Sequence, residues 1–347
     1  KIIDAVKLAA RFLKGEVTPK EVRPDPKGPK LGVSHPRPSA LSMACGTAQY
    51  TGDIMVRDAL ELAVVQSPHA HALIKGIGIE KAAKMPGVFG VMTAKDIKGT
   101  NRLKIVVDDR PVLCEDKVRC IGDPIAVVAA LTREQAVAAA KAVEVEYELL
   151  PVLTTPEEAL AEDATEVHGE PNLCYTELQI KGDAKEALSQ AAVVVKNRFI
   201  TQINHQAPLE TEACVCYLEG EGEEAQLVVI GRSINIHKHL EMLQEALGWG
   251  NMRYEEAYTG GQFGIKIDIT SEGIAAGAAL HFKKPVRYIP GLAETMLMTS
   301  KRHPFDMDVV LGADSKGKLT AFQMDALVDN GAYTSIGRNV IHRAFQM

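Results

Sequence analysis

The sequence has few cysteines and no long apolar run, and these absences exclude two classes of protein. Six cysteines are spread over 347 residues, and none belongs to a Cys-x-x-Cys pair. A secreted domain held together by disulfides needs a denser and more regular set, so we expect a reducing compartment, the cytoplasm. The longest apolar runs, 125–131 and 273–280, fall well short of the roughly 18 residues of a membrane span, so no span is predicted.

Charge of one sign is not concentrated anywhere in the chain. Lys and Arg total 39 and Asp and Glu total 45, which gives a net charge of −6. Because no basic block is present, nucleic acid is not an expected partner. The length of 347 residues and the hydrophobic content of 46% are enough for roughly two or three domains with cores of their own.

The first 44 residues predict a helix and a linker. Residues 2–13 place apolar side chains at helical spacing, and Gly15 follows as a cap. Six prolines between positions 19 and 38 indicate a linker over 16–44, because proline interrupts both helices and sheets. The chain starts without Met and stops abruptly. We therefore expect an internal piece of a longer polypeptide, with residues 1–15 closing a preceding domain.

Residues 45–155 predict a compact unit of strands and one helix. Short apolar runs at 60–65, 72–77 and 88–93 indicate strands. Residues 123–131 are typical of a buried strand, and 143–150 alternate as a further strand. Between these two, Thr132 and Gln135 predict a capping box at the start of a helix.

Residues 156–347 predict a second mixed unit. The expected strands and helices are strands 193–200, 213–220, 225–231, 306–314 and 319–329, and helices 236–249 and 271–282. Helices and strands do not alternate strictly, so the predicted fold class is α+β rather than a doubly wound sheet.

The stretch TGGQFGIKIDIT at 259–270 is the most informative candidate site. Gly260 and Gly261 follow a predicted strand, and glycine lets backbone amides approach a bound group closely. The helix start that follows favours an anionic or oxo ligand. A tight structural turn is the alternative, and glycine content alone favours it.

Five other patterns have plainer interpretations. GADSKGKL at 312–319 has the spacing of a phosphate-binding loop, but Leu319 stands where Ser or Thr would bind magnesium, so a hairpin turn is predicted. His237 and His239 lie two apart on a predicted helix and cannot share a metal ion. For His69 and His71, no third ligand lies close in sequence. Cys214 and Cys216 are predicted to be small core side chains. NHQAPLETEA at 204–213 has groups for acid–base chemistry, but a hydrogen-bonded loop is favoured.

Read together, several stretches resemble the molybdenum hydroxylases, the family of xanthine dehydrogenases and aldehyde oxidoreductases. Residues 64–97 and 121–152 resemble its hammerhead domain. The stretches that resemble its first molybdenum-cofactor domain are 205–213, 259–266, 270–280 and 328–337. The resemblance implies a hammerhead domain at 45–155 and an incomplete cofactor domain at 156–347. Residues 1–15 resemble the last helix of the iron–sulfur domain, and the order without a flavin domain is similar to the flavin-free aldehyde oxidoreductases.

The resemblance also implies a site. Gly261, Gln262, Phe263 and Gly264 are expected to approach a molybdenum–pterin cofactor through backbone amides, and Ile267 is expected to line the substrate funnel. Xanthine dehydrogenases carry a purine-recognising Glu where this chain has Ile267, so an aldehyde is favoured. This sequence departs from the family's pattern at two places. Gln262 replaces a smaller residue, and GRSIN at 231–235 lacks a Gln that xanthine dehydrogenases have in the corresponding segment. No side chain is implied as a metal ligand or a catalytic residue.

The implied reaction is the oxidation of aldehydes to carboxylic acids, with oxygen from water and electrons leaving through 2Fe-2S clusters outside this chain. The implied cofactor is a molybdenum–pterin in dinucleotide form. The implied partners are the iron–sulfur domain, a second molybdenum-cofactor domain, an external electron acceptor and a second copy of the full protein. Because the family's general base lies in that second domain, we expect these 347 residues alone to be inactive. Two alternatives stay open: a subunit of a split hydroxylase for an N-heterocycle such as nicotinate or a purine, and a non-catalytic scaffold fragment.

Overall fold

The computed structural model describes residues 7, 10–11, 14–16, 32 and 37–345. Most of the helix predicted over 2–13 and most of the linker predicted over 16–44 lie outside the described residues. At the end of that predicted linker, after the last of its prolines, a short helix α2 (Ala40–Ala44) forms. The linker prediction is therefore wrong for these five residues.

A seven-stranded sheet is the largest element of the fold, and it draws strands from both predicted units. Its order is β10-β9-β8-β11-β1-β5-β3. The strands are β1 (Leu60–Gln66), β3 (Val88–Thr93), β5 (Pro124–Ala130), β8 (Cys214–Glu219), β9 (Gln226–Gly231), β10 (Met252–Glu256) and β11 (Val286–Tyr288). The two units meet where β1 pairs in parallel with β11, Leu60 opposite Val286. They therefore share one sheet and one core.

Both faces of this sheet are covered in its centre, and β5 shows why. Every residue of β5 is buried. Successive side chains of a strand point to opposite faces. Val127 and Ala129 belong to the core beneath α7 (Ile236–Leu247) and α8 (Thr270–Phe282). Ala126 and Val128 belong to the core on the other face, which α4 (Arg133–Ala140) covers. A continuous apolar run is the pattern expected of such a strand.

The helix α8 lies in the middle of the main core, and its small residues permit this. All residues from Thr270 to Ala279 are buried. A Cβ placed on Gly277 would already touch Leu247 Cδ2 at 3.4 Å and Met92 Cε at 3.5 Å. The predicted buried, small-residue helix at 271–282 is confirmed. Its close packing brings the start of α8 next to the end of the glycine-rich stretch.

A smaller sheet packs beside β5 in the first half of the chain. Its order is β4 (Lys117–Val118), β2 (Ala72–Gly78) and β6 (Glu144–Leu149), with α3 (Glu80–Ala83) after β2. The helix α4 begins as predicted, because the Thr132 side chain accepts a hydrogen bond from the Gln135 amide at 3.3 Å. The return bond of the predicted capping box does not form, since the Gln135 side-chain oxygen is buried without a hydrogen-bond partner.

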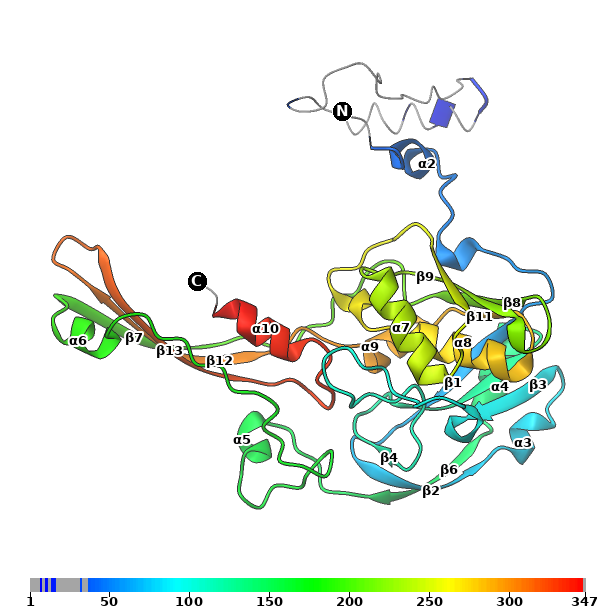
Figure 1. Ribbon diagram of the computed structural model, residues 1–347, viewed down its shortest axis with the longest axis horizontal. Helices are drawn as coiled ribbons and strands as arrows, with labels where there is room; N and C mark the ends of the chain where they lie inside the picture. The colour runs from blue at the N-terminus through cyan, green and yellow to red at the C-terminus, as the bar shows by residue number, and fades with distance from the viewer. Residues whose placement is uncertain (1–6, 8–9, 12–13, 17–31, 33–36, 346–347) are drawn as a thin grey trace.

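A three-stranded arm extends away from the rest of the molecule (Figure 1). It consists of β7 (Val193–Ile200), β12 (Phe305–Ala313) and β13 (Leu319–Val328), with α6 (Ala184–Ser189) packed on it. Every residue of β7 is exposed. The turn of the β12–β13 hairpin contains Gly317 at a φ of +81°. The hairpin turn predicted at 312–319 is thus confirmed.

The described residues also form the α-helices α5 (Pro156–Ala159), α9 (Leu292–Met298) and α10 (Gly337–Ala344) and four short 3₁₀ segments. The sheets combine parallel pairs, β1 with β11 and β9 with β10, with antiparallel pairs elsewhere. The predicted α+β class is confirmed. In the described part of the chain, no helix is both long and apolar enough to cross a membrane.

The joint core predicts a large cost for removing one of its side chains. Leu243 of α7 is fully buried against the main sheet. We expect Leu243→Ala to lower the free energy of unfolding by about 2–5 kcal/mol, because it removes buried apolar surface and leaves a cavity. Urea denaturation measures this. Leu178, which is 79% exposed, supplies the control, since its replacement by Ala should change stability by less than about 0.5 kcal/mol. Equal effects of the two changes would contradict the described core.

Candidate functional site

The stretch after β10 forms a half-buried turn with an unusual backbone conformation. In this glycine-rich turn (residues 259–264), φ is +105° at Gly261, +50° at Phe263 and +88° at Gly264. Phe263 is 74% exposed. Among the described residues, the amides of 261–264 have no hydrogen-bond acceptor. Successive free amides in a turn with positive φ form a concave donor site for oxygen-bearing or anionic groups.

A second loop packs so closely against this turn that side chains larger than glycine have no room at Gly260 and little room at Gly261. A Cβ on Gly260 would lie 2.6 Å from Glu210 Cβ, and one on Gly261 would lie 3.2 Å from Pro208 Cβ. Distances under about 3 Å are not tolerated between such atoms, so Gly260 cannot be replaced without movement of the loop. The structure therefore brings together the two stretches 204–213 and 259–266, which the sequence identified separately.

Glu210 is the centre of the contact between the two loops. Its Oε2 accepts hydrogen bonds from the Gly260 amide at 2.8 Å and from Lys266 Nζ at 2.8 Å, and it lies 3.2 Å from Arg232 Nε. The side chains of Lys266 and Arg232 are each 1% exposed, and that of Glu210 is 12% exposed. Glu210 Oε1 is buried and has no hydrogen-bond partner in the described part.

Two further carboxyl groups lie in the same buried cluster. Burial, with a smaller contribution from the charge of Glu272, raises the pKa of Glu212 to about 8, although Lys266 and Arg232 oppose the shift. Glu272, in the first turn of α8, accepts a hydrogen bond from the Tyr254 hydroxyl at 3.0 Å. Burial raises the pKa of Glu272 as well. Arg232 and Lys266 both pair with Glu210 inside this cluster, so the buried cations have a partner of opposite charge.

Asp268 joins the glycine-rich turn to two other segments. It follows the short 3₁₀ segment η4 (Ile265–Ile267). Its Oδ2 lies 3.1 Å from Arg110 Nη1 and its Oδ1 accepts a hydrogen bond from Ser335 at 2.6 Å. All three side chains are buried. The half-buried Ile267 is therefore held between the first half of the chain and the segment that precedes α10.

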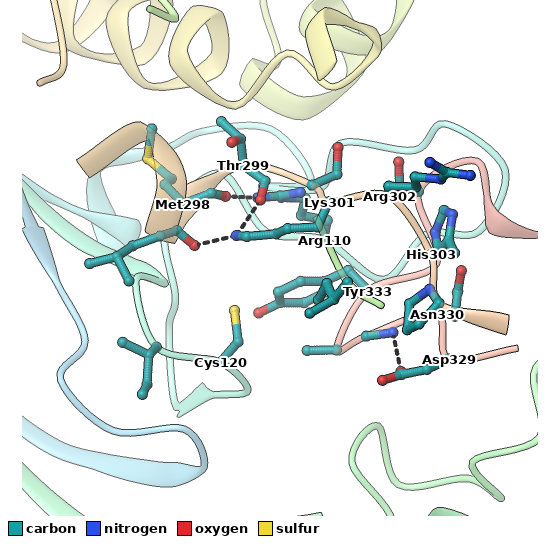
Figure 2. Close-up of a pocket in the computed structure, with 18 residues that line it drawn as sticks. Arg110, Cys120, Met298, Thr299, Lys301, Arg302, His303, Asp329, Asn330 and Tyr333 are labelled. Carbon is teal, nitrogen blue, oxygen red and sulfur yellow. Dashed lines mark hydrogen bonds between the residues drawn. The ribbon is translucent and has the colours of Figure 1, made fainter. Parts of the chain in front are cut away.

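A cavity of about 260 Å³ adjoins this junction (Figure 2). Arg110 and Ser335 line it, and the Arg110 guanidinium lies 5.5 Å from the centre of the Tyr333 ring. Figure 2 shows the thiol of Cys120 close to the Tyr333 side chain. The Cys120 thiol contacts Asp123 at 3.1 Å, and its burial raises its pKa far above the ordinary value. Cys120 therefore remains a thiol and is not a nucleophile.

Two family profiles match this chain. The profile described as the aldehyde oxidase and xanthine dehydrogenase a/b hammerhead domain matches residues 45–151, and that of the molybdopterin cofactor-binding domain matches residues 167–347. The chain belongs to the aldehyde oxidase and xanthine dehydrogenase family of molybdopterin proteins. A hammerhead domain is thus followed by a molybdopterin-binding domain, as the resemblance implied, whereas the boundary between 155 and 156 stays a prediction.

Relatives in this family support the assignment along the whole chain. An aldehyde oxidoreductase of Megalodesulfovibrio gigas is 35% identical over 97% of this chain, and the aligned part is 39% of that protein. The large molybdopterin subunit of nicotinate dehydrogenase from Eubacterium barkeri is 35% identical over 90% of this chain and 74% of its own length. A solved aldehyde oxidoreductase from Desulfovibrio gigas has a TM-score of 0.87 at 34% identity, covering 97% of this chain and 39% of that one. The chain thus spans about two fifths of the aldehyde oxidoreductases.

The turn of this family member is suited to a molybdopterin cofactor. Donors are provided by free amides at 261–264, and the glycines leave the approach open, since nothing lies within 4 Å of a Cβ on Gly264. A group that carries oxygen atoms or negative charge fits such a turn. Within the described residues, no cluster of three or more His, Cys, Asp or Glu side chains could hold a metal ion.

The remaining sequence-predicted residues lie away from this turn or take part in packing. His239 is buried, and its Nδ1 is 2.8 Å from Ser233 Oγ. His71 Nδ1 is 2.6 Å from the Pro151 carbonyl oxygen. Cys214 and Cys216 are buried in the main core, as predicted. His205, from the loop 204–213, contacts Thr299 Oγ1 at 3.0 Å. That loop is hydrogen-bonded as favoured, but its two carboxyl groups also belong to the buried cluster.

Sequence reasoning missed the buried charged residues beneath the turn. Arg232 and Lys266 each follow or precede apolar residues, and Glu272 stands at the start of a helix of small residues. A charge inside a stretch that is otherwise typical of a core is the signal that could have identified them, because isolated charges are rarely buried unless paired. Which charges pair with which could not be derived from spacing, because as many as 56 positions separate two partners.

The raised pKa of Glu212 predicts a change in the pH dependence of stability. The folded-state pKa of about 8 lies above the ordinary 4.5, so the folded state binds this proton more tightly than the unfolded state. The stabilisation is complete below about pH 4.5 and is lost as the pH rises through about 8, a loss on the order of a few kcal/mol. Glu212→Gln should flatten this decline in urea titrations between about pH 5 and pH 9.

The exposed Glu157 provides the control for this titration. Glu157→Gln should leave the pH dependence of unfolding as it is in the unmodified chain, because this side chain is not buried. The interpretation fails if the free energy of unfolding falls with pH equally in Glu212→Gln and Glu157→Gln.

Proposed function

We propose that this chain is part of a molybdenum-dependent aldehyde oxidoreductase that converts aldehydes to carboxylic acids. The observation that carries the proposal is the glycine-rich turn, with free amides at 261–264 and an apolar Ile267 directly after it, in a member of this molybdopterin family. The overall change is RCHO + H₂O → RCOOH + 2e⁻ + 2H⁺, so water supplies the oxygen and two electrons must leave.

In this proposal the cofactor is a molybdenum–pterin in dinucleotide form, bound at the glycine-rich turn. Backbone amides of Gly261, Gln262, Phe263 and Gly264 donate to its oxygen ligands. When bound, the cofactor supplies the two-electron oxidation and the transfer of oxygen from water. The chain's own part is to hold these donors in place and to exclude competing orientations of the substrate.

Ile267 is proposed to line the substrate funnel and to favour an aldehyde. Its side chain is apolar and half-buried, and Asp268 beside it is already engaged by Arg110 and Ser335. A purine has several hydrogen-bonding groups, and isoleucine cannot pair with them. The apolar part of an aldehyde has no such groups, so it loses no hydrogen bonds beside Ile267. The similarity to an aldehyde oxidoreductase, at 34–35% identity in sequence and in structure, supports this substrate class.

The proposal assigns residues 45–155 to the hammerhead domain and 156–347 to the first part of the cofactor domain. The remaining parts are an iron–sulfur domain with 2Fe-2S clusters, a second molybdenum-cofactor domain, an external electron acceptor and a homodimeric partner. The aligned aldehyde oxidoreductase is more than twice as long as this chain, which leaves room for these parts. All six cysteines are free thiols, consistent with a cytoplasmic protein.

A second candidate function is the hydroxylation of an N-heterocycle by a split enzyme. The nicotinate dehydrogenase subunit is as similar as the aldehyde oxidoreductase, at 35% identity, and this chain covers 74% of it. This high share of the relative's length is the observation that favours the candidate.

Metal and substrate analysis of the protein from its native source tests the proposal. We expect molybdenum and a pterin dinucleotide in the purified full-length protein, and reduction of an artificial electron acceptor with aldehydes but not with nicotinate or hypoxanthine. Activity with nicotinate alone would replace the proposal by the second candidate. Absence of molybdenum from the native protein would favour the non-catalytic scaffold.

Substitution of Ile267 tests the substrate assignment in the full-length protein. We expect Ile267→Glu to lower kcat/KM for an aromatic aldehyde by roughly 10- to 100-fold, because a carboxylate would be placed against an apolar substrate. The matched control is Ile267→Leu, which keeps the volume and polarity and should retain most of the activity. Steady-state kinetics at equal molybdenum content measures both. Equal kcat/KM values for the two variants would remove Ile267 from the funnel.

A further inference from the structure

The glycine-rich turn does not hold its conformation by its own hydrogen bonds. Within the turn and η4, the Ile265 amide donates to the Gln262 carbonyl at 3.0 Å. Three of the residues from Gly261 to Gly264 have positive φ, and one of them, Phe263, is not a glycine. Such conformations cost free energy and persist only when the surroundings enforce them. The restraint must come from outside the turn.

Glu210 contacts residues on both sides of the free amides at 261–264. Before it, the Glu210 amide donates to the Gly260 carbonyl at 3.2 Å, while the Gly260 amide donates to Glu210 Oε2 at 2.8 Å. After it, Lys266 Nζ donates to the same oxygen at 2.8 Å. One carboxylate oxygen thus connects Gly260, directly before the free amides, with Lys266, the second residue after them.

The carboxylate itself is held by the sheet. Arg232 directly follows β9, is 2% exposed, and places Nε 3.2 Å from Glu210 Oε2. Arg232 Nη1 donates to the Gly231 carbonyl at 2.7 Å, so this guanidinium is anchored on the backbone of the strand end. Arg232 and Glu210 form a buried ion pair, and the attraction between two opposite charges is screened far less inside a protein than in water. The turn is therefore tied to the rigid sheet through a chain of buried charges.

We propose that Glu210 is the positioning residue of the cofactor site: its carboxylate clamps Gly260 and Lys266 and so fixes the free amides at 261–264. The role of Glu210 in cofactor binding rests on the proposed function, because the amides that it fixes are the proposed cofactor donors. The contacts of Glu210 with the turn do not depend on that function. Glu210 acts through the turn and is not a catalytic residue.

Glu210→Asp tests the clamp without altering charge. The substitution keeps the negative charge for Arg232 and Lys266 but shortens the side chain by one methylene, so the carboxylate no longer reaches the Gly260 amide. The matched control is Glu219→Asp on β8, an exposed carboxylate that pairs with Arg253 at 3.1 Å and does not touch the turn. Both variants are made in the full-length protein, purified without cofactor from a host that cannot synthesise the pterin.

Amide hydrogen exchange, followed by mass spectrometry, reads the conformation directly. In Glu210→Asp, the hydrogen-bonded amides of Gly260 and Ile265, read in peptides that cover 258–268, should exchange about tenfold faster or more, the change expected when a hydrogen bond to a charged group is lost. Peptides from α8 and β5 should keep their protection. In Glu219→Asp, all of these peptides should exchange as in the unmodified protein. Unchanged exchange over 258–268 in Glu210→Asp would overturn the proposal.

Loss of protection in all peptides would mean that Glu210→Asp does not fold. In that case Lys266→Met tests the clamp. This variant removes only the bond on the far side of the turn, and it should speed exchange over 258–268 while α8 stays protected. If it leaves exchange over 258–268 unchanged, the clamp is overturned.

Metal content separates the clamp from the proposed function. When the full-length protein is produced with cofactor, Glu210→Asp should retain less than about one fifth of the molybdenum held by the unmodified protein, and Glu219→Asp should retain all of it. Faster exchange in Glu210→Asp with no molybdenum even in the unmodified protein would refute the proposed function and leave the clamp standing. Faster exchange with full molybdenum retention would overturn the assignment of Glu210 to the cofactor site.

Discussion

The pairing of β1 with β11 is the constraint on which the rest of this structure depends. Leu60 donates its amide to the Pro285 carbonyl at 2.8 Å, and the buried Arg287 pairs with Glu61 and donates to the Gly52 carbonyl at 2.9 Å. This seam joins strands from the hammerhead region to strands from the molybdopterin-binding region in a single sheet. Main-chain hydrogen bonds and a shared core join the two regions in one packed unit. The site residues from both are thereby held in one frame.

The candidate site lies where several strand and helix ends meet. Arg232 follows β9, the glycine-rich turn comes after β10, and Glu272 belongs to the first turn of α8. Strand and helix ends leave backbone groups unpaired, so loops at these positions can present amides while the regular elements stay rigid. The buried charges beneath the turn are acceptable in free energy only because they neutralise each other, since a single unpaired charge would be costly there. The same burial keeps a proton on Glu212 at neutral pH.

The hammerhead region also reaches the site through Arg110. Its guanidinium donates to the Met298 carbonyl and pairs with Asp268, which directly follows Ile267. Ser335 completes this junction from the segment that leads into α10. The position of the proposed substrate-lining residue thus depends on three segments, and one of them belongs to a region that contributes nothing to the glycine-rich turn. This gives the hammerhead region a structural role in the site, beyond that of a neighbouring domain.

Local patterns in the sequence determined the secondary structure and the identity of the family. Apolar runs predicted β1, β3 and β5, small residues predicted α8, and the ordered motifs from 64 to 337 predicted a molybdenum hydroxylase. The strands and helices follow from the spacing of apolar residues along the chain. The family followed from the resemblance of the ordered motifs, not from spacing. Only the tertiary structure decided that the two units share a sheet, because the three-residue strand β11 has too short a pattern to detect. It also decided that Glu210 touches Gly260 and Lys266, about fifty residues away. A buried pair of opposite charges leaves no periodic trace in a sequence, since its geometry arises from the packing of whole elements.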